Sequence, residues 1–240
     1  MKTAYRKEQK LLKSNKAFKL MKTIRTILIF LLWTGLLHAQ EQMPAFWEDI
    51  QAFKKQDSIT PSPKNAILFI GSSSFTNWKD VQDYFPGFTI VNRGFGGSTL
   101  LDQIRYADDI IFPYQPKQIV IYCGENDLAY SDTVSAQTVF TRFTILFDMI
   151  RHVHKDVPVD FISIKPSPSR EHLMPKMIEA NKLIKNYLAS KTSTGFIDVY
   201  AKMLTADGKL MPEIYVEDKL HMNAKGYAIW QKEIEPYLVQ

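Results

Sequence analysis

Three short polar turns and one acid–histidine pair hold the side chains of this 240-residue chain that are best suited to chemistry. The turns lie at residues 71–74 (GSSS), 94–98 (GFGGS) and 124–127 (GEND), and the pair is Asp218 with His221. A serine hydroxyl is a weak nucleophile until a neighbouring base removes its proton. Asp218 lies close enough in sequence to His221 for the carboxylate to orient the imidazole. Glycine lets the backbone approach a ligand closely, so the turns predict a shallow site lined by backbone N–H groups.

Each of these turns follows a short apolar segment that is typical of a buried strand. Five such segments occur, at residues 66–70, 89–92, 118–122, 159–164 and 195–199, and they are apolar on both faces, as covered parallel strands are. Longer helical patterns separate them. This alternation predicts an α/β fold with an open, mainly parallel five-stranded sheet and helices on both faces. In such sheets sites form at the carboxyl ends of the strands, where the three turns lie.

Three helices are expected from the spacing of apolar residues. The clearest covers residues 135–154, with one continuous apolar stripe. Residues 42–56 have a shorter amphipathic pattern, which a proline-rich segment at 60–63 would end. A last helix is expected from about residue 223 to 237, directly after Asp218 and His221. The inward-facing residues are expected to be Phe46, Ile50 and Phe53 in the second helix and Tyr227, Trp230 and Ile234 in the third.

The first 39 residues differ in composition from the rest of the chain. Residues 1–26 carry nine basic residues and one acid, and an uncharged apolar run follows from residue 27 to 37. This layout is typical of a secretory signal peptide, with cleavage expected after Ala39. Met21 begins a more typical leader by itself, so both Met1 and Met21 are candidate starts. A retained amphipathic or anchoring helix is the alternative interpretation of this segment.

The leader accounts for the positive charge of the chain. The whole sequence has 30 Lys and Arg against 25 Asp and Glu, a formal net charge of +5. Removing the nine basic residues and one acid of residues 1–39 leaves 21 against 24, a net of −3. We therefore expect no nucleic-acid partner. We expect an exported protein, periplasmic or extracellular, with no stable membrane span after cleavage.

Four sequence blocks, in order, resemble the SGNH (GDSL-type) hydrolases. They are Gly-x-Ser at 71–73, the glycine turn at 94–97, Gly-x-Asn-Asp at 124–127 and Asp-x-x-His at 218–221. The resemblance covers residues 66–236 and implies a flavodoxin-like three-layer α/β/α sandwich. It divides the chain into an N-terminal extension and signal peptide (1–39), a helical segment (40–60) and a hydrolase domain (61–240).

The same resemblance implies a role for each candidate site residue. Ser73 would be the nucleophile, His221 its base and Asp218 the group that orients the histidine. The oxyanion hole would consist of the backbone N–H groups of Ser73 and Gly97 with the side-chain amide of Asn126. Two alternatives stay open. The family often has Gly-Asp-Ser where this chain has three serines in a row, so Ser72 and Ser74 are alternative nucleophiles, and Gly96 is an alternative donor.

Four other polar residues near the strand ends are given supporting roles. Asn92 and Asp127 are expected to hold their own loops in place. Lys165 and Arg170 follow the fourth strand, so they should border the site, either in a rigid proline turn or in contact with a polar or anionic substrate. The single cysteine, Cys123, excludes an intramolecular disulfide and is expected to be buried.

The resulting prediction is an exported serine esterase that needs no cofactor or metal. Its substrate would be a small-molecule or polysaccharide ester, most consistent with short O-acetyl groups on carbohydrate. The alternatives are a lysophospholipase- or thioesterase-like activity, an acyltransferase, or a non-catalytic carbohydrate-binding protein on the same scaffold. The sequence has no Gly-x-Ser-x-Gly elbow, P-loop or His-Glu-x-x-His segment, which argues against three other enzyme classes. The oligomeric state is not readable from it.

Overall fold

The computed structural model describes residues 6, 10, 16, 18–25 and 43–240. The chain divides into two compact units, Met1–Ala45 and Phe46–Gln240. In the first unit, residues 18–25 are helical. The apolar run of the expected signal peptide and its cleavage site after Ala39 lie outside the described residues. Among the helices that are described, none is both long and apolar enough to span a membrane.

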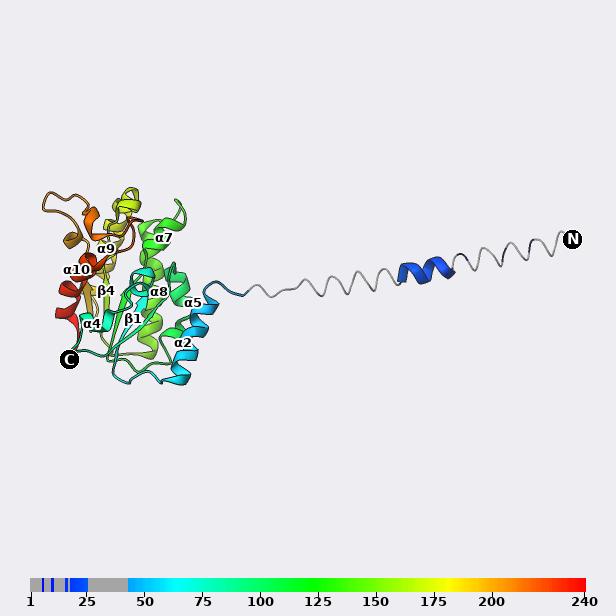
Figure 1. Ribbon diagram of the computed structural model, residues 1–240, viewed down its shortest axis with the longest axis horizontal. Helices are drawn as coiled ribbons and strands as arrows, with labels where there is room; N and C mark the ends of the chain where they lie inside the picture. The colour runs from blue at the N-terminus through cyan, green and yellow to red at the C-terminus, as the bar shows by residue number, and fades with distance from the viewer. Residues whose placement is uncertain (1–5, 7–9, 11–15, 17, 26–42) are drawn as a thin grey trace. The chain divides into compact units, whose positions relative to one another are not determined.

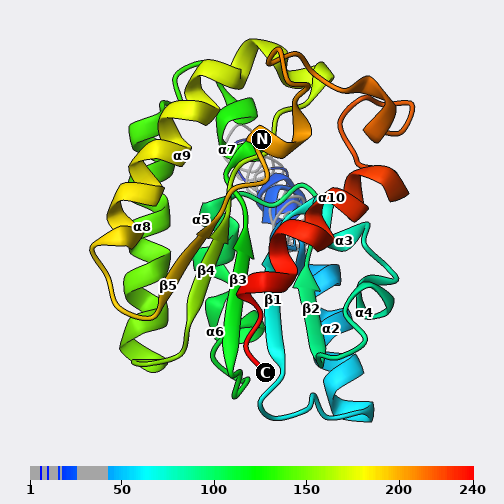
Figure 2. The same ribbon diagram turned by 90° about the vertical axis from the view of Figure 1, so that its left-hand side faces the viewer.

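The second unit is built on five parallel strands (Figures 1 and 2). Their order across the sheet is β2-β1-β3-β4-β5, with β1 and β3 paired at its centre. All four pairings are parallel, so the carboxyl ends of the strands meet at one edge, at the top of Figure 2. The strands are β1 (Ile67–Gly71), β2 (Ile90–Gly94), β3 (Gln118–Tyr122), β4 (Val159–Ile162) and β5 (Thr194–Ile197).

Alternate residues of the central strands enter two separate apolar cores, one on each face of the sheet. In β1, Leu68 and Ile70 pack into the first core, whereas Ile67 and Phe69 pack into the second. The helices on the first face are α2 (Trp47–Ile59), α5 (Leu100–Arg105), α6 (Ala107–Ile110), α7 (Glu125–Tyr130), α8 (Ala136–Val153) and α9 (Met174–Ala189). The elements on the second are α3 (Ser73–Thr76), α4 (Val81–Tyr84), α10 (Ala224–Ile234) and the 3-10 turns η2 (Ala201–Met203) and η3 (Pro212–Ile214). The predicted three-layer α/β/α sandwich with a five-stranded sheet is confirmed.

The fourth strand is shorter than predicted, because a side chain takes over its hydrogen bonds. The sequence predicts a strand to residue 164, but β4 ends at Ile162. At Ile164 the backbone N–H donates to Oδ1 of Asn181 at 2.8 Å, and Nδ2 of Asn181 donates to the Ile164 carbonyl at 2.9 Å. The buried amide of α9 therefore satisfies both backbone groups, and the chain leaves the sheet there towards the 3-10 turn η1 (Pro168–Leu173).

Two of the expected helices differ from the structure only at their ends. Helix α2 begins at Trp47 rather than at residue 42 and continues to Ile59. Ile50 is buried in the first core, and Phe46 and Phe53 pack against it, as the apolar spacing predicted. Helix α10 ends at Ile234, and the 3-10 turn η4 (Glu235–Tyr237) continues the chain, because a proline at 236 has no N–H to extend an α-helix.

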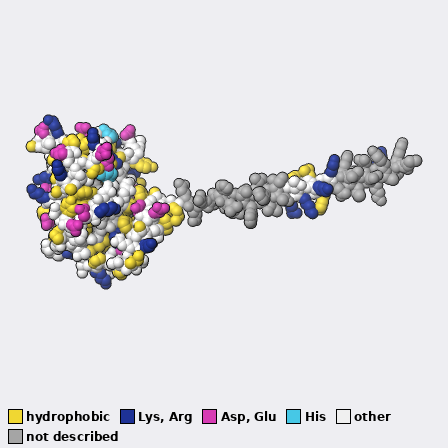
Figure 3. Space-filling view, in the orientation of Figure 1, with side chains coloured by type: hydrophobic (Ala, Val, Ile, Leu, Met, Phe, Trp, Pro, Cys, Tyr) yellow, Lys and Arg dark blue, Asp and Glu magenta, His cyan; other side chains and the backbone are white. Residues whose placement is uncertain are grey.

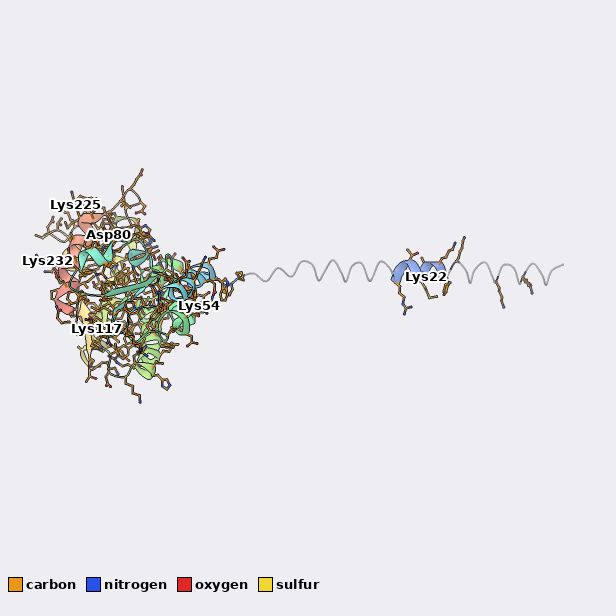
Figure 4. The ribbon with its side chains drawn as sticks, turned by 60° about the horizontal axis from the view of Figure 1, so that its bottom comes forward. Lys22, Lys54, Asp80, Lys117, Lys225 and Lys232 are labelled. Atoms are coloured by element: carbon orange, nitrogen blue, oxygen red, sulfur yellow. The ribbon has the colours of Figure 1, made fainter. Side chains whose placement is uncertain are left out.

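Helix α10 shows how the surface and the core are separated. Its buried residues Tyr227, Trp230 and Ile234 belong to the second core, whereas Lys225 and Lys232 project outward (Figure 4). On the face of the domain shown in Figure 3, basic and acidic side chains are interspersed. The helix is therefore amphipathic. Its apolar face packs on the second core and so fixes the position of the loop before α10.

Candidate active site

The turn after β1 exposes one serine of the three. Ser72 and Ser74 are buried, each 2 % exposed, whereas Ser73 is partly exposed at the start of α3. The turn is tied to the neighbouring strand, since the Ser72 N–H donates to the Tyr122 carbonyl at 3.0 Å. Gly71, with φ +144°, has room for no side chain, because a Cβ would lie 1.9 Å from the same carbonyl oxygen. The local fold therefore aims the Ser73 hydroxyl out of the sheet edge.

Ser73, His221 and Asp218 form a continuous chain of hydrogen bonds. The Ser73 Oγ lies 2.9 Å from Nε2 of His221, and Nδ1 of His221 lies 2.6 Å from Oδ2 of Asp218. The imidazole thus contacts the hydroxyl through one nitrogen and the carboxylate through the other. Of the three serines in the turn, Ser73 is the one that His221 contacts.

Backbone donors hold the Asp218 carboxylate in place. Its Oδ1 accepts from the N–H groups of Leu220 at 2.8 Å and His221 at 2.9 Å. Partial burial works to raise the pKa of Asp218, but the hydrogen bonds from the His221 ring and from these N–H groups outweigh it and lower that pKa to about 2. The carboxylate therefore stays ionised at neutral pH and can stabilise a positive charge on the imidazole.

The loop that carries this pair is closed on itself and fixed to α10. The Val216 N–H donates to the His221 carbonyl at 2.8 Å, and Lys219 adopts a left-handed conformation with φ 56° between them. Asn223, two residues after His221, caps α10, because its side chain accepts hydrogen bonds from the N–H groups of Lys225 and Gly226. Its Nδ2 also donates to the Tyr215 carbonyl at 3.0 Å. The packed helix therefore fixes the position of the histidine.

The three predicted oxyanion donors lie in turns at this same edge. Within residues 43–240, the N–H groups of Ser73 and Gly97 donate to no protein acceptor. Gly97 has a left-handed φ of +83°, which favours glycine, and it is exposed, whereas Gly96 is partly buried. The Asn126 amide donates to the Ser98 carbonyl at 3.0 Å, which leaves its second hydrogen free. Each of these groups therefore has an N–H hydrogen that no described acceptor uses, and each is held by a different loop.

Asn92 and Asp127 hold their loops in place, as predicted. Asn92 accepts from the Gly94 N–H at 2.9 Å and donates to the Phe75 carbonyl at 2.8 Å, so it links the second turn to α3. Asp127 accepts from the Leu100 N–H at 2.9 Å and from Arg142 at 2.8 Å. Cys123 is fully buried, also as predicted.

The site contains a buried charge cluster that sequence analysis missed. Glu125, 4 % exposed, accepts from the Tyr122 hydroxyl at 2.7 Å and lies 3.0 Å from Nζ of Lys165 and 3.4 Å from Arg170. Burial by itself would raise the pKa of Glu125, but the charges of Lys165 and Arg170 outweigh it and hold that pKa below its ordinary value. The cluster is therefore an ion pair between charged groups under the sheet edge.

The suggestion that Lys165 contacts a substrate is wrong. Lys165 is 1 % exposed, and its ammonium donates to Glu125 and, at 2.9 Å, to the carbonyl of Leu220, the residue before His221. A buried ammonium must be paired, and the Lys165 ammonium is paired with Glu125 and the Leu220 carbonyl. The sequence marks both residues, one as a charge directly after an apolar strand and the other as an acid inside the Gly-x-Asn-Asp block, but it does not pair them.

Residues 57–229 match the model of the GDSL-like lipase/acylhydrolase family. The chain belongs to that family. It is therefore an acylhydrolase by family, the group of enzymes that hydrolyse ester bonds, and its Gly71-Ser72-Ser73 stands where the family's Gly-Asp-Ser often does. No curated protein matches the chain in sequence.

Solved structures share the fold of this acylhydrolase at low sequence identity. A Streptococcus pneumoniae protein described as a platelet activating factor has 22 % identity and a TM-score of 0.70, covering 89 % of this chain and 99 % of its own. A Bacteroides fragilis protein described as an acylhydrolase has 23 % identity and a TM-score of 0.67, with 80 % and 96 % covered. A mutant of an acetyl-xylooligosaccharide esterase from Geobacillus has 16 % identity and a TM-score of 0.57, with 73 % and 95 % covered. At these identities the likeness concerns the fold.

Proposed function

We propose that this acylhydrolase is an exported serine esterase that uses Ser73, His221 and Asp218 as a catalytic triad. The observation that carries the proposal is the hydrogen-bond chain from the Ser73 hydroxyl through both nitrogens of His221 to Asp218. A histidine so placed can take the serine proton, and an ionised aspartate fixes the tautomer that makes this possible. The exposure of Ser73 beside two buried serines supports it as the nucleophile.

The reaction follows from these positions. The Ser73 Oγ attacks the ester carbonyl carbon while His221 Nε2 takes its proton, and the carbonyl oxygen becomes negative. The N–H groups of Ser73 and Gly97 and the free amide hydrogen of Asn126 stabilise that oxygen. His221 then protonates the leaving alcohol, which leaves an acyl-serine. A water molecule, deprotonated by His221, attacks the acyl carbon, and the acid is released as Ser73 regains its proton.

The substrate class we propose is a short acyl ester on carbohydrate. The site lies in turns at the sheet edge, and the His221 side chain is 27 % and the Asp218 side chain 47 % exposed. Such an open site suits an acetyl group on a bulky polar alcohol. The structural neighbour from Geobacillus, an acetyl-xylooligosaccharide esterase, supports this choice.

Export rests on the composition of the N-terminal segment. The basic region, the apolar run and Ala39 together have the layout of a signal peptide. The test is the N-terminus of the protein recovered outside the cytoplasm of its bacterial expression host. It should begin at Gln40, and recovery of the uncleaved chain inside the cytoplasm would contradict export.

The nucleophile is tested by serine variants within the same turn. Purified protein should hydrolyse 4-nitrophenyl acetate and release acetate from acetylated xylooligosaccharides, and Ser73→Ala should lose at least about 10³-fold in kcat. The matched control is Ser72→Ala, because the Ser72 side chain makes no capping hydrogen bond in the wild type. The activity of this variant should stay within about threefold of wild type. A fluorophosphonate should label Ser73 in the wild type. Full activity in Ser73→Ala would overturn the assignment, and absence of labelling would favour a binding protein.

The same assay separates hydrolysis from transfer. An acyltransferase would use the same acyl-serine but pass the acyl group to a sugar hydroxyl instead of water. Product analysis with unacetylated xylooligosaccharide added as acceptor should show free acetate alone. Acetylated acceptor as the main product would replace the esterase by a transferase.

A further inference from the structure

The Asn126 amide is held in one orientation by two partners of opposite character. Its Nδ2 donates to the Ser98 carbonyl at 3.0 Å, and its Oδ1 accepts from Arg170 at 3.0 Å. If the amide turned over, its oxygen would face the carbonyl oxygen of Ser98 and its NH₂ would face the guanidinium. Both contacts would then be repulsive, because a carbonyl cannot donate and a guanidinium cannot accept. The observed orientation is therefore locked, with one amide hydrogen left free.

Arg170 is itself held in place by the buried Glu125. Its second arm lies 3.4 Å from Oε1 of Glu125, a carboxylate buried to 4 % exposure. The guanidinium is a rigid planar fork, so fixing one arm on Glu125 fixes where the other arm meets Asn126. The 3-10 turn that carries Arg170 is also tied to the histidine loop, since the Ser169 N–H donates to the Lys219 carbonyl at 3.1 Å. Arg170 thus links the Asn126 turn to the loop of His221.

We propose that Arg170 is a positioning residue that orients the Asn126 amide towards the oxyanion of the reaction. This inference rests on the proposed function, because Asn126 is an oxyanion donor only if Ser73 attacks an ester. Arg170 would act through Asn126 and not on the substrate. One arm of its guanidinium donates to Asn126 and the other is ion-paired with Glu125, and its side chain is 18 % exposed. Without it, the Ser98 carbonyl is the one remaining partner that the structure describes for the amide, so the amide is held less firmly towards the oxyanion.

A double-mutant cycle on 4-nitrophenyl acetate tests the proposal. Arg170→Met alone should lower kcat by about 10- to 100-fold with KM changed less than about twofold, as a misaimed oxyanion donor would. Asn126→Ala should have a loss of similar size or larger. In the Asn126→Ala background, Arg170→Met should lower kcat further by less than about twofold, because the amide that Arg170 positions is gone. The matched control is Arg105→Met on α5, an exposed arginine, which should leave kcat unchanged in both backgrounds.

Arg170→Met is expected to fold, because Glu125 keeps two partners when Arg170 is removed: Lys165 at 3.0 Å and the Tyr122 hydroxyl at 2.7 Å. The Tm of each variant is measured alongside kcat. Equal losses from Arg170→Met with and without Asn126 would overturn the proposal, since they would mean a structural role or a direct substrate contact. A rise in KM alone would also overturn it. If the wild type lacks esterase activity or Ser73→Ala retains it, the proposed function has failed instead, before the cycle is measured.

Discussion

At the scale of single residues, the site depends on which atom of each side chain faces which neighbour. Asp218 shows this most sharply. One of its oxygens accepts from two backbone N–H groups and the other accepts from the His221 ring. Every one of these contacts requires an acceptor on the aspartate. The aspartate therefore defines the tautomer of the histidine as well as its position.

Asp218→Asn should abolish most of the activity while leaving the fold intact. The two backbone N–H groups need an oxygen, so the amide nitrogen of the variant would face Nδ1 of His221 and donate to it. The ring proton would then sit on Nε2, which could no longer accept the Ser73 proton. We expect kcat on 4-nitrophenyl acetate to fall by about 10³- to 10⁴-fold, with a small change in Tm. Asp207→Asn, in an exposed loop, is the control, and a loss below about tenfold in Asp218→Asn would contradict this account.

Local sequence blocks predicted where the candidate site residues lie, but gave no signal for the contacts of Lys165. Ser73, Asn126 and the Asp218–His221 pair lie in blocks that can be read locally. The contact of Lys165 with Glu125 joins positions 40 residues apart, and its contact with Leu220 joins positions 55 apart. No periodicity or spacing encodes such pairs, because strand order and loop packing bring them together. The same reason explains why the sequence left a substrate contact open for Lys165.

At the scale of elements, the glycine at the end of β1 decides how closely the two central strands approach. Gly71 pairs with Gly94 on one side and Tyr122 on the other. A Cβ there would lie 1.9 Å from the Tyr122 carbonyl oxygen and 2.7 Å from its carbon, which are backbone atoms of β3. Backbone in a paired strand cannot move aside as a flexible side chain can. The strand end therefore requires glycine, and so does the turn that presents Ser73.

Gly71→Ala should destabilise the domain and inactivate it together. Adding one methyl group would force β1 and β3 apart where Ser73 leaves the sheet, and we expect a loss of about 3 kcal/mol or more in the free energy of unfolding. Chemical denaturation followed by circular dichroism would measure it. Gly87→Ala is the matched control, because a Cβ there would meet nothing within 4 Å. Wild-type stability in Gly71→Ala would contradict the close approach of the strands.

The five strands and the three expected helices followed from the sequence, whereas their ends did not. All five strands lie where short apolar segments predicted them, because burial on both faces leaves a clear pattern. The end of β4 was misplaced by two residues, since residues 163 and 164 are as apolar or small as a strand would be. Asn181, from a helix 17 residues further along, ends the pairing there. Its role is a tertiary contact without a local signal.

At the scale of the whole molecule, the C-terminal segment is held against the sheet by the buried amide of Gln118, which also donates to a buried carboxyl group. Asp160 on β4 accepts from the amide of Gln118 on β3, and the same amide donates to the Tyr237 carbonyl at 2.8 Å. Gln118 Oε1 in turn accepts from the Val239 N–H at 2.9 Å. Burial raises the pKa of Asp160 to about 6, although the Gln118 hydrogen bond and the charge of Arg151 oppose the shift. The folded protein therefore holds a proton on Asp160 more tightly than the unfolded chain does.

This carboxyl group should make the domain less stable as the pH rises through about 6. The pKa of Asp160 is raised above the ordinary 3.8. The loss of stability caused by its ionisation is therefore absent below about pH 4 and complete above about pH 6. Asp160→Asn keeps an oxygen acceptor for Gln118 and never ionises. We expect it to gain about 2–3 kcal/mol at pH 7.5 and little at pH 4, measured by denaturant unfolding at both pH values. Asp132→Asn, in an exposed turn, is the control, and an equal gain at both pH values would point to a cause other than ionisation.

The proposed base and nucleophile are separated by 148 positions in the chain, which sets the moment at which the enzyme can first act. A ribosome adds about 5–20 residues each second, so Ser73 emerges many seconds before the histidine that would activate it. In the proposed mechanism, the growing polypeptide is inactive through that time, because Ser73 has no base beside it. Activity begins only when the segment that ends in α10 has been made and has packed onto the sheet. In the proposed mechanism, the order of synthesis therefore delays activity until the C-terminal segment has folded.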